Sequence, residues 1–280
     1  FSFDPGYVKE ELYPCINHNN PTSFGCLEKM YNSYGFRGIE FQKQKHDVDF
    51  RIFAVGGSTT FGSGAVDDET WPAHLQQIIN QEITDKNIEV INTGSSGASS
   101  ETEYRIIKDK ISALDPDLII MYDGWNDWKD LPIEKTIQNW KSVCELGKNV
   151  GFDTIIIVQP LPITGHRVLT EQEVTNSYPN FSYLQTTQQY VDAFKELNEV
   201  CTKTADFSRI FDYVQKPVFF DEGHTMSFGN KIIAENVFSI ISDSFGKTYS
   251  IIQSYENNLE TGVVYAVGAD LSGKNFDNLN

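Results

Sequence analysis

Short apolar runs alternate along the chain with longer segments in which apolar residues recur at helical spacing. The runs are rich in β-branched residues and lie at 51–55, 89–91, 117–122 and 154–158, with a weaker one at 209–211. The segments of helical period lie at 71–83, 102–114, 133–150, 187–202 and 227–242. Nearly continuous apolar strands separated by helices are typical of a parallel sheet that is covered on both faces. The pattern predicts an α/β fold, a three-layer α/β/α flavodoxin-like sandwich with a five-stranded parallel sheet.

The same pattern divides the chain into three parts. Residues 1–48 show no sustained period, so we expect an irregular N-terminal segment packed on a main domain at 49–245. Within that domain, the connection at 159–183 is long for a helix–strand loop and is expected to form a lid or a pocket wall.

Residues 246–280 form a C-terminal extension whose sequence pattern differs from the alternating strands and helices before it. Leu271 and Phe276 are five residues apart, and a small or polar residue stands two positions before each. This spacing resembles the opening of a pentapeptide-repeat solenoid, so we expect the start of a truncated repeat region. A disordered tail with chance spacing is the alternative. The chain begins at Phe1 without Met, which indicates a processed or excised form.

Acidic residues outnumber basic ones, with 39 Asp and Glu against 22 Lys and Arg in 280 residues. The net charge of −17 argues against nucleic acid as a partner and against an anionic membrane surface, because both need clustered cations. No stretch reaches the roughly 18 uninterrupted apolar residues of a membrane-spanning helix. The composition is therefore that of a soluble globular protein.

The four cysteines, Cys15, Cys26, Cys144 and Cys201, form no Cys-x-x-Cys pair and have no His at zinc-ligand spacing. A disulfide between Cys15 and Cys26 would staple a polar loop. Cys144 and Cys201 fall on two predicted helices that flank the strand at 154–158 and would lie side by side on one face of the sheet. Two bridges are therefore feasible, which favours an oxidising, extracytoplasmic compartment. Four reduced thiols are the alternative.

Four polar loops carry the candidate chemistry, and each follows a predicted strand. The loop at 56–62 contains Ser58, the loop at 92–98 contains Gly97, and the loop at 124–127 contains Asn126. The fourth, Asp221-Glu222-Gly223-His224, precedes the last helix. Each is weak alone, but the carboxyl ends of parallel strands gather at one edge of the sheet, which would bring the loops together. The first loop lacks the Lys of a phosphate-binding loop and the spacing of the G-x-S-x-G nucleophile elbow.

These four loops resemble the blocks of the SGNH, or GDSL-like, hydrolases, which are named for a Ser, a Gly, an Asn and a His. The matching residues are Ser58, Gly97, Asn126 and His224, the last with Asp221, and the resemblance covers residues 51 to about 243. Trp71-Pro72-Ala73 and the N-terminal Asn32-Ser33-Tyr34-Gly35-Phe36-Arg37-Gly38 also look like segments found in members of the family. One position departs from the usual Gly-Asp-Ser block, because Gly57 replaces the Asp, as in a Gly-Gly-Ser-Thr-Thr variant.

The resemblance implies an SGNH-type catalytic domain at 49–245 that uses no metal and no cofactor. Ser58 would be the nucleophile and His224 its general base, with Asp221 orienting the imidazole. The backbone N–H groups of Ser58 and Gly97 and the side-chain amide of Asn126 would form the oxyanion hole. The substitution at Gly57 puts in doubt how firmly the nucleophile loop is held, and therefore the reaction rate.

Three further residues are candidates for substrate binding: Thr59, Trp125 and His166. Trp125 flanks Asn126 and is expected either to pack beneath the third loop or to form an apolar or sugar-stacking wall. His166 lies in the long connection at 159–183. It is expected either to contact a substrate or to have an ordinary structural role.

These features together favour the hypothesis of a serine ester hydrolase that acts through an acyl-enzyme on a small acyl ester or an acylated glycan. A carbohydrate O-acetyl esterase or another short-chain acyl esterase fits best. Acyl transfer on the same residues is an alternative. A non-catalytic cell-surface module that binds glycan or protein is another, favoured by Gly57 and the repeat-like tail.

Overall fold

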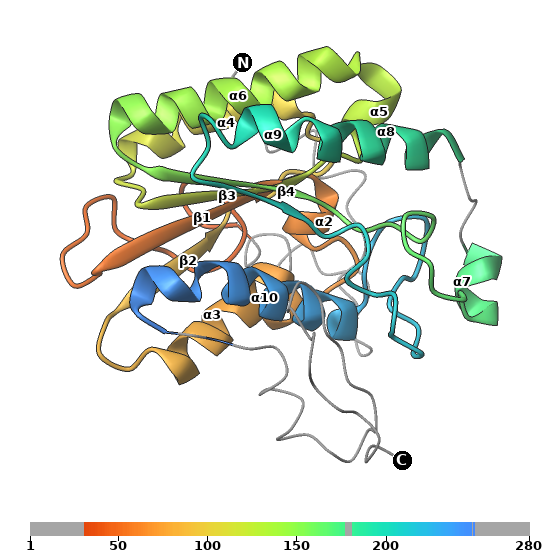
Figure 1. The fold of residues 1–280 in the computed structure, drawn as a ribbon. Helices are drawn as coiled ribbons and strands as arrows, with labels where there is room; N and C mark the ends of the chain where they lie inside the picture. Colours follow the sequence, from red (N-terminus) through yellow and green to blue (C-terminus); the bar gives the residue numbers. More distant parts are fainter. Residues whose placement is uncertain (1–30, 177–180, 248, 250–280) are drawn as a thin grey trace, which may run out of the picture.

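The structure of the chain is a computed structural model that describes residues 31–176, 181–247 and 249. Five parallel strands form one sheet in the order β2-β1-β3-β4-β5 (Figure 1). The strands are β1 (Phe50–Gly56), β2 (Ile88–Asn92), β3 (Leu118–Asp123), β4 (Asp153–Val158) and β5 (Lys203–Asp206). This order is the flavodoxin-like one, so the predicted fold class is confirmed.

Helices cover both faces of the sheet (Figure 1). One layer holds α3 (Trp71–Glu82) and α10 (Ser227–Ile241), which pack against each other. The other layer holds α4 (Ser100–Asp109), α6 (Ile133–Val150), α8 (Phe181–Asp192) and α9 (Phe194–Leu197). Three short helices lie in the connections: α2 (Ser58–Phe61), α5 (Asp127–Asp130) and α7 (Glu171–Asn176).

Alternation along the central strands divides the core into two halves. In β1, Ile52 and Ala54 pack into the cluster beneath α3 and α10, whereas Phe53 and Val55 pack into the cluster beneath α4 and α6. All four side chains are fully buried. A central strand that is buried on both faces must be apolar at every position, which explains why the apolar runs were readable in the sequence.

The sequence pattern placed the fifth strand wrongly. It was expected at 209–211, but Ile210 and Phe211 lie in turns and bury their side chains in the α3/α10 half of the core. The observed strand β5 lies at the edge of the sheet and is only partly buried, so it needs no apolar run.

The helix expected at 187–202 also differs from the prediction. Here α8 begins at Phe181, and the short helix α9 follows it and ends at Leu197. Cys201 therefore lies in a bend before β5 rather than on a helix.

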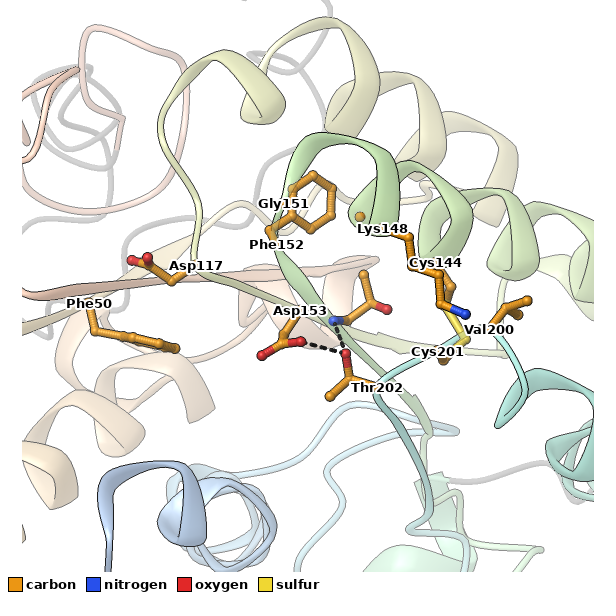
Figure 2. Close-up of a pocket in the computed structure, with 12 residues that line it drawn as sticks. Phe50, Asp117, Cys144, Lys148, Gly151, Phe152, Asp153, Val200, Cys201 and Thr202 are labelled. Carbon is orange, nitrogen blue, oxygen red and sulfur yellow. Dashed lines mark hydrogen bonds between the residues drawn. A yellow bond between two sulfur atoms is a disulfide. The ribbon is translucent and has the colours of Figure 1, made fainter.

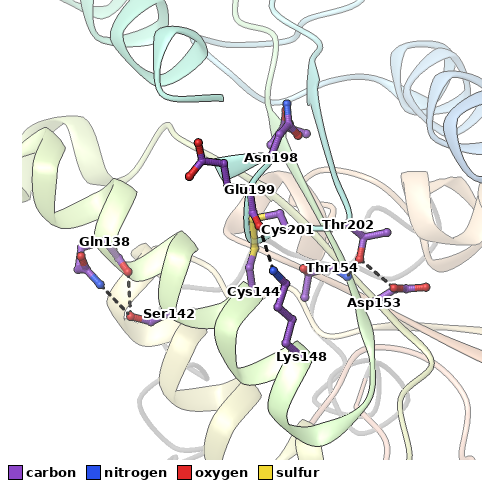
Figure 3. The surroundings of a disulfide bond; sticks show 11 residues. Gln138, Ser142, Cys144, Lys148, Asp153, Thr154, Asn198, Glu199, Cys201 and Thr202 are labelled. Atoms are coloured by element: carbon purple, nitrogen blue, oxygen red, sulfur yellow. Dashed lines mark hydrogen bonds between the residues drawn. A yellow bond between two sulfur atoms is a disulfide. The ribbon is translucent and has the colours of Figure 1, made fainter. Parts of the chain in front are cut away.

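The predicted disulfide between Cys144 and Cys201 is confirmed (Figure 3). It ties α6 to the bend before β5, across a sequence separation of 57 residues. Beside it, a cavity of about 470 Å³ opens among the amino ends of the strands, where Phe50 and Asp153 line it (Figure 2). The cavity lies at the sheet edge opposite to the loops that carry the candidate chemistry.

Residues 31–48 form no regular helix or strand, and Phe36, with Tyr34 and Phe41 beside it, packs into the α4/α6 half of the core. The Cys15–Cys26 pair and the repeat-like Leu271 and Phe276 lie outside the described residues. In the portion of the chain that the structure describes, no helix is both long and apolar enough to cross a membrane.

The disulfide generates the first prediction. Closing a loop of 57 residues restricts the unfolded chain, which corresponds to about 4 kcal/mol of stabilisation in the chain-entropy picture. The double variant Cys144→Ala/Cys201→Ala should therefore unfold at lower urea concentration, with a free energy of unfolding reduced by about 2–4 kcal/mol. Wild-type protein unfolded with an excess of reductant is the matched control and should show a similar loss. An unchanged midpoint in both experiments would mean that the bridge does not form.

Candidate active site

Ser58 stands where β1 passes into the first turn of α2, at the carboxyl edge of the sheet. β1 ends at Gly56, and Ser58 is the first residue of α2, with its side chain partly exposed. The first N–H groups of a helix have no partner within the helix. In the described part of the chain, the backbone N–H of Ser58 donates to no protein acceptor, and neither does that of Gly97.

Ser58, His224 and Asp221 form a continuous hydrogen-bonded chain. The hydroxyl Oγ of Ser58 lies 2.7 Å from Nε2 of His224, and Nδ1 of the same ring lies 2.8 Å from Oδ2 of Asp221. A carboxylate only accepts, so Nδ1 carries the ring proton, and Nε2 of the neutral ring accepts from the serine hydroxyl. The geometry brings together the three residues that the sequence proposed as a triad.

Asp221 is held as an anion in this chain. Burial alone would raise its pKa, but the hydrogen bond and charge of His224 and the backbone N–H groups of His224 and Gly223 outweigh burial and lower the pKa below its usual value. Both N–H groups donate to Oδ1, at 2.8 and 2.9 Å, which fixes the turn from Asp221 to His224. The second oxygen is thereby left free to face the imidazole.

Two aromatic rings enclose the imidazole of His224. Trp125 meets it edge-on with ring centroids 5.1 Å apart, and Phe220 stacks on it at 5.6 Å. A Cβ added at Gly223 would lie within 2.6 Å of three carbons of the Trp125 ring, so a glycine is required where this ring approaches the loop. Trp125 therefore packs against the side of His224 and against the turn at Gly223.

Asn126 reaches over the loop that carries the nucleophile. Its Nδ2 donates to the carbonyl oxygen of Ala98, 2.7 Å away, next to Gly97. A Cβ on Gly57 would lie 2.3 Å from the same Nδ2, so the amide occupies the space that a side chain at position 57 would need. An amide nitrogen carries two N–H groups, and the bond to Ala98 leaves one for a substrate oxygen.

The loops that carry the three candidate oxyanion donors thus approach one another. The loops that contain Ser58, Gly97 and Asn126 touch through Gly57 and Ala98. The replacement of the usual Asp by Gly57 has a physical reason in this chain, because any side chain there would displace the Asn126 amide. The catalytic roles of these residues stay predictions.

Thr59 and His166 lie differently from the residues above. The hydroxyl of Thr59 is buried and donates to Oε1 of Gln159 at 3.1 Å, so it faces the protein interior. His166 is mostly exposed and pairs with Asp212 at 3.5 Å. Within the described residues, neither side chain hydrogen-bonds to Ser58 or His224.

The long connection holds a residue that the sequence reasoning missed. Glu173 of α7 is buried, and its Oε1 accepts from the backbone N–H groups of Val218 and Phe219, at 2.9 and 3.1 Å. Burial raises the pKa of Glu173, but these donors and those of Thr170 outweigh it and hold the pKa below its usual value. The connection thus anchors the segment that leads to His224, and nothing in its polar sequence pattern indicates that role.

A cluster of buried carboxyl groups lies beneath the loop of Asn126. It consists of Glu103, Asp123 and Asp127, all almost fully buried. Burial, together with the charge of Asp127, raises the pKa of Asp123 to about 7, although the indole N–H of Trp140 donates to this carboxyl and opposes the rise. Burial and the charges of both aspartates raise the pKa of Glu103 well above its usual value. In the described residues, no group of three or more His, Cys, Asp and Glu side chains is placed to hold a metal ion.

Comparison with known proteins identifies the fold but not a sequence family. The sequence matches no family profile and no curated protein. A structure assigned to the G-D-S-L lipolytic family, from Desulfitobacterium hafniense, is 20% identical, with a TM-score of 0.52 over 68% of this chain and 98% of that one.

Two esterase structures are similar to the same degree. An acetyl xylan esterase is 14% identical, with a TM-score of 0.56 over 69% of this chain and 100% of that one. A variant of an acetyl-xylooligosaccharide esterase from Geobacillus is 16% identical, with a TM-score of 0.55 over 70% and 95%. At these identities the similarity shows the fold. The chain therefore has the fold of the SGNH hydrolases, as the four loops implied.

The buried acids generate a prediction about stability and pH. Asp123 titrates near 4 when the chain is unfolded and at about 7 when it is folded, so the folded state holds this proton more tightly. The stability that protonated Asp123 contributes to the folded state is fully present below pH 4 and is lost as the pH rises through 7.

Asp123→Asn removes this titration and keeps position 123 neutral at every pH. At pH 8 its free energy of unfolding, measured with urea, should therefore exceed that of wild type by roughly 2–4 kcal/mol, with a much smaller gain at pH 4.5. Glu103→Gln should change in the same direction. A difference between variant and wild type that is equal at both pH values would refute the assignment.

Proposed function

We propose that this chain is a serine ester hydrolase that works through an acyl-enzyme. The observation that carries the proposal is the pair of short contacts on one imidazole, 2.7 Å to the hydroxyl of Ser58 and 2.8 Å to the carboxylate of Asp221. A serine hydroxyl becomes a useful nucleophile when a base within hydrogen-bond distance removes its proton and a third group orients that base. Similar esterase structures add support at the level of the fold.

In the proposed reaction, Oγ of Ser58 attacks the ester carbonyl carbon while Nε2 of His224 takes the hydroxyl proton. The imidazolium that forms is stabilised by the adjacent carboxylate of Asp221 and then protonates the leaving alcohol. Water enters, gives a proton to the same nitrogen and attacks the acyl-enzyme. The bond between the acyl carbon and Oγ of Ser58 then breaks, and the imidazolium of His224 returns its proton to Oγ as the carboxylic acid is released.

The negative charge that develops on the carbonyl oxygen needs donors that are in place beforehand. The N–H of Ser58, the N–H of Gly97 and the remaining N–H of the Asn126 amide are the candidates, because their loops meet beside the nucleophile. Losing one such donor in other enzymes costs about 3–4 kcal/mol of activation free energy.

We further propose that the substrate is a carbohydrate O-acetyl ester or another short-chain acyl ester. Ser58 is partly exposed at the sheet edge, and Trp125 and Phe220 give the surroundings of His224 an aromatic character suited to a sugar ring. An acetyl xylan esterase is among the similar structures. The Cys144–Cys201 disulfide supports an extracytoplasmic location as part of the same proposal.

A non-catalytic binding module has less support than the sequence alone gave it. That alternative drew on Gly57, which departs from the usual block. The close approach of the Asn126 amide to Gly57 gives this glycine a structural reason that is compatible with the proposed oxyanion hole.

Replacing the nucleophile is the direct experiment. Wild type should hydrolyse p-nitrophenyl acetate and react with a fluorophosphonate probe at Ser58, as located by peptide mass spectrometry. Ser58→Ala should abolish the labelling and lower kcat by at least about 10³-fold. Ser96→Ala, an exposed serine on the neighbouring loop, is the matched control and should keep the wild-type rate. Absence of labelling in the wild type would contradict the proposal.

The Gly57–Asn126 contact gives a second, independent prediction. Gly57→Ala should push the amide aside and lower kcat about 100- to 1000-fold, the usual effect of losing one oxyanion donor. Asn126→Ala should cause a loss of similar size. Because both changes remove the same donor, the double variant should be no slower than either single one. Losses that multiply in the double variant would show that position 57 acts independently of Asn126.

A further inference from the structure

Arg37 belongs to the irregular N-terminal stretch, yet its side chain reaches the turn that carries Ser58. The backbone of Arg37 forms antiparallel bridges to Tyr31 on one side and to Asn92, at the end of β2, on the other. These bridges dock the stretch on the carboxyl edge of the sheet. The side chain is only 3% exposed, although it carries a permanent charge.

Every N–H group of the Arg37 guanidinium has a partner. Nη1 donates to the carbonyl oxygens of Phe61 and Gly62, at 2.8 and 2.9 Å. Nη2 donates to the carbonyl oxygen of Ala65 at 2.8 Å, and Nε and Nη2 share the carboxylate of Asp67 at 3.0 and 2.9 Å. The guanidinium also lies over the ring of Phe61, 4.9 Å from its centroid. Three of these acceptors are backbone carbonyls at or just after the end of α2.

α2 begins with Ser58 and ends with Phe61, so the held carbonyls are one turn away from the nucleophile. The last carbonyls of a helix have no partner inside it, and a cation at that end is favoured by the helix dipole. A helix of one turn has almost no stability of its own, so the position of its first residue depends on what holds its last ones.

We propose that Arg37 is a positioning residue for the nucleophile: it clamps the carbonyl end of α2 and thereby sets Oγ of Ser58 against Nε2 of His224. The inference rests on the proposed function, since it matters for catalysis only if Ser58 is the nucleophile. On this proposal, residues 31–48 help to position the nucleophile and do not only pack on the surface of the main domain. A displacement of about 1 Å at a reacting atom can lower a rate about 100-fold.

Arg51 offers a matched control for Arg37. It is also a buried arginine, and its Nη1 donates to the carbonyl oxygens of Lys43 and Leu114, at 2.9 and 2.5 Å. It likewise ties the N-terminal stretch to the sheet. Arg51 lies at the amino end of β1, whereas Ser58 follows the carboxyl end of the same strand. The contacts of Arg51 therefore contribute to stability without touching α2.

The experiment compares Arg37→Lys with Arg51→Lys, and Arg37→Ala with Arg51→Ala. Lysine keeps the charge but has three N–H donors on one nitrogen and cannot reproduce the fork of the guanidinium. The readouts are kcat and KM for p-nitrophenyl acetate, the rate of fluorophosphonate labelling at Ser58, and the melting temperature. The ¹⁵N shift of Nε2 of His224, recorded without substrate, reports the hydrogen bond to Ser58 independently of activity.

We expect Arg37→Lys to lower kcat and the labelling rate about 10- to 100-fold with KM within twofold of wild type, and to shift the Nε2 resonance. Arg51→Lys should lower the melting temperature by about as much as Arg37→Lys does, while kcat stays within twofold of wild type. Free guanidinium ion at millimolar concentration should restore part of the labelling rate in Arg37→Ala and none in Arg51→Ala.

Two results would overturn the inference. One is a wild-type kcat and an unshifted Nε2 resonance in Arg37→Lys. The other is an equal loss of kcat in both lysine variants, which would reduce Arg37 to a stabilising role. If wild type itself is neither labelled nor active, the proposed function fails, and the Nε2 resonance still decides whether Arg37 holds Ser58 against His224.

Discussion

Ser58 stands on a single turn of helix, and the remaining architecture of the carboxyl edge follows from keeping that turn in place. One turn gains too few hydrogen bonds to remain formed alone. Its end is held by Arg37, and the threonine hydroxyls inside it bond to Gln159 at 3.1 Å and to the indole of Trp71 at 3.3 Å. These partners come from the N-terminal stretch, the end of β4 and the start of α3. The alignment of the serine is therefore a property of the assembled domain.

A buried charged side chain also holds the segment that leads to His224, and here it is a carboxylate rather than a guanidinium. Glu173 buries a carboxylate to hold the backbone at Val218 and Phe219, just before the turn of Asp221. A buried charge is tolerated only when hydrogen bonds or an ion pair satisfy it. Here the N–H groups of Val218, Phe219 and Thr170 do so, together with the buried guanidinium of Arg167, which pairs with the same carboxylate. Two irregular segments are thus each held by a buried ionised side chain, Arg37 in one case and Glu173 in the other.

The sequence predicted well where one local pattern was sufficient. The central strands β1, β3 and β4 were found because they are buried on both faces and therefore mostly apolar. The edge strand β2 is partly exposed and contains Glu89, and only its short apolar run indicated it. Ser58, Gly97 and Asn126 were found because their loops follow β1, β2 and β3, whereas Asp221 and His224 were found from the resemblance of their loop to a block of the SGNH hydrolases. The edge strand β5 was missed because its residues, Lys203–Asp206, are partly exposed, while the apolar Phe211 belongs to a turn. The roles of Glu173 and Arg37 depend on where irregular segments dock, which no periodicity encodes.

The disulfide lies among the amino ends of the strands, and the hydrogen-bonded chain of Ser58, His224 and Asp221 lies at their carboxyl ends. The covalent brace and the proposed reacting groups therefore occupy separate regions of the molecule, at opposite ends of the strands. Mutations that loosen or strengthen the braced end can accumulate without altering the reacting groups, and the reverse is equally true.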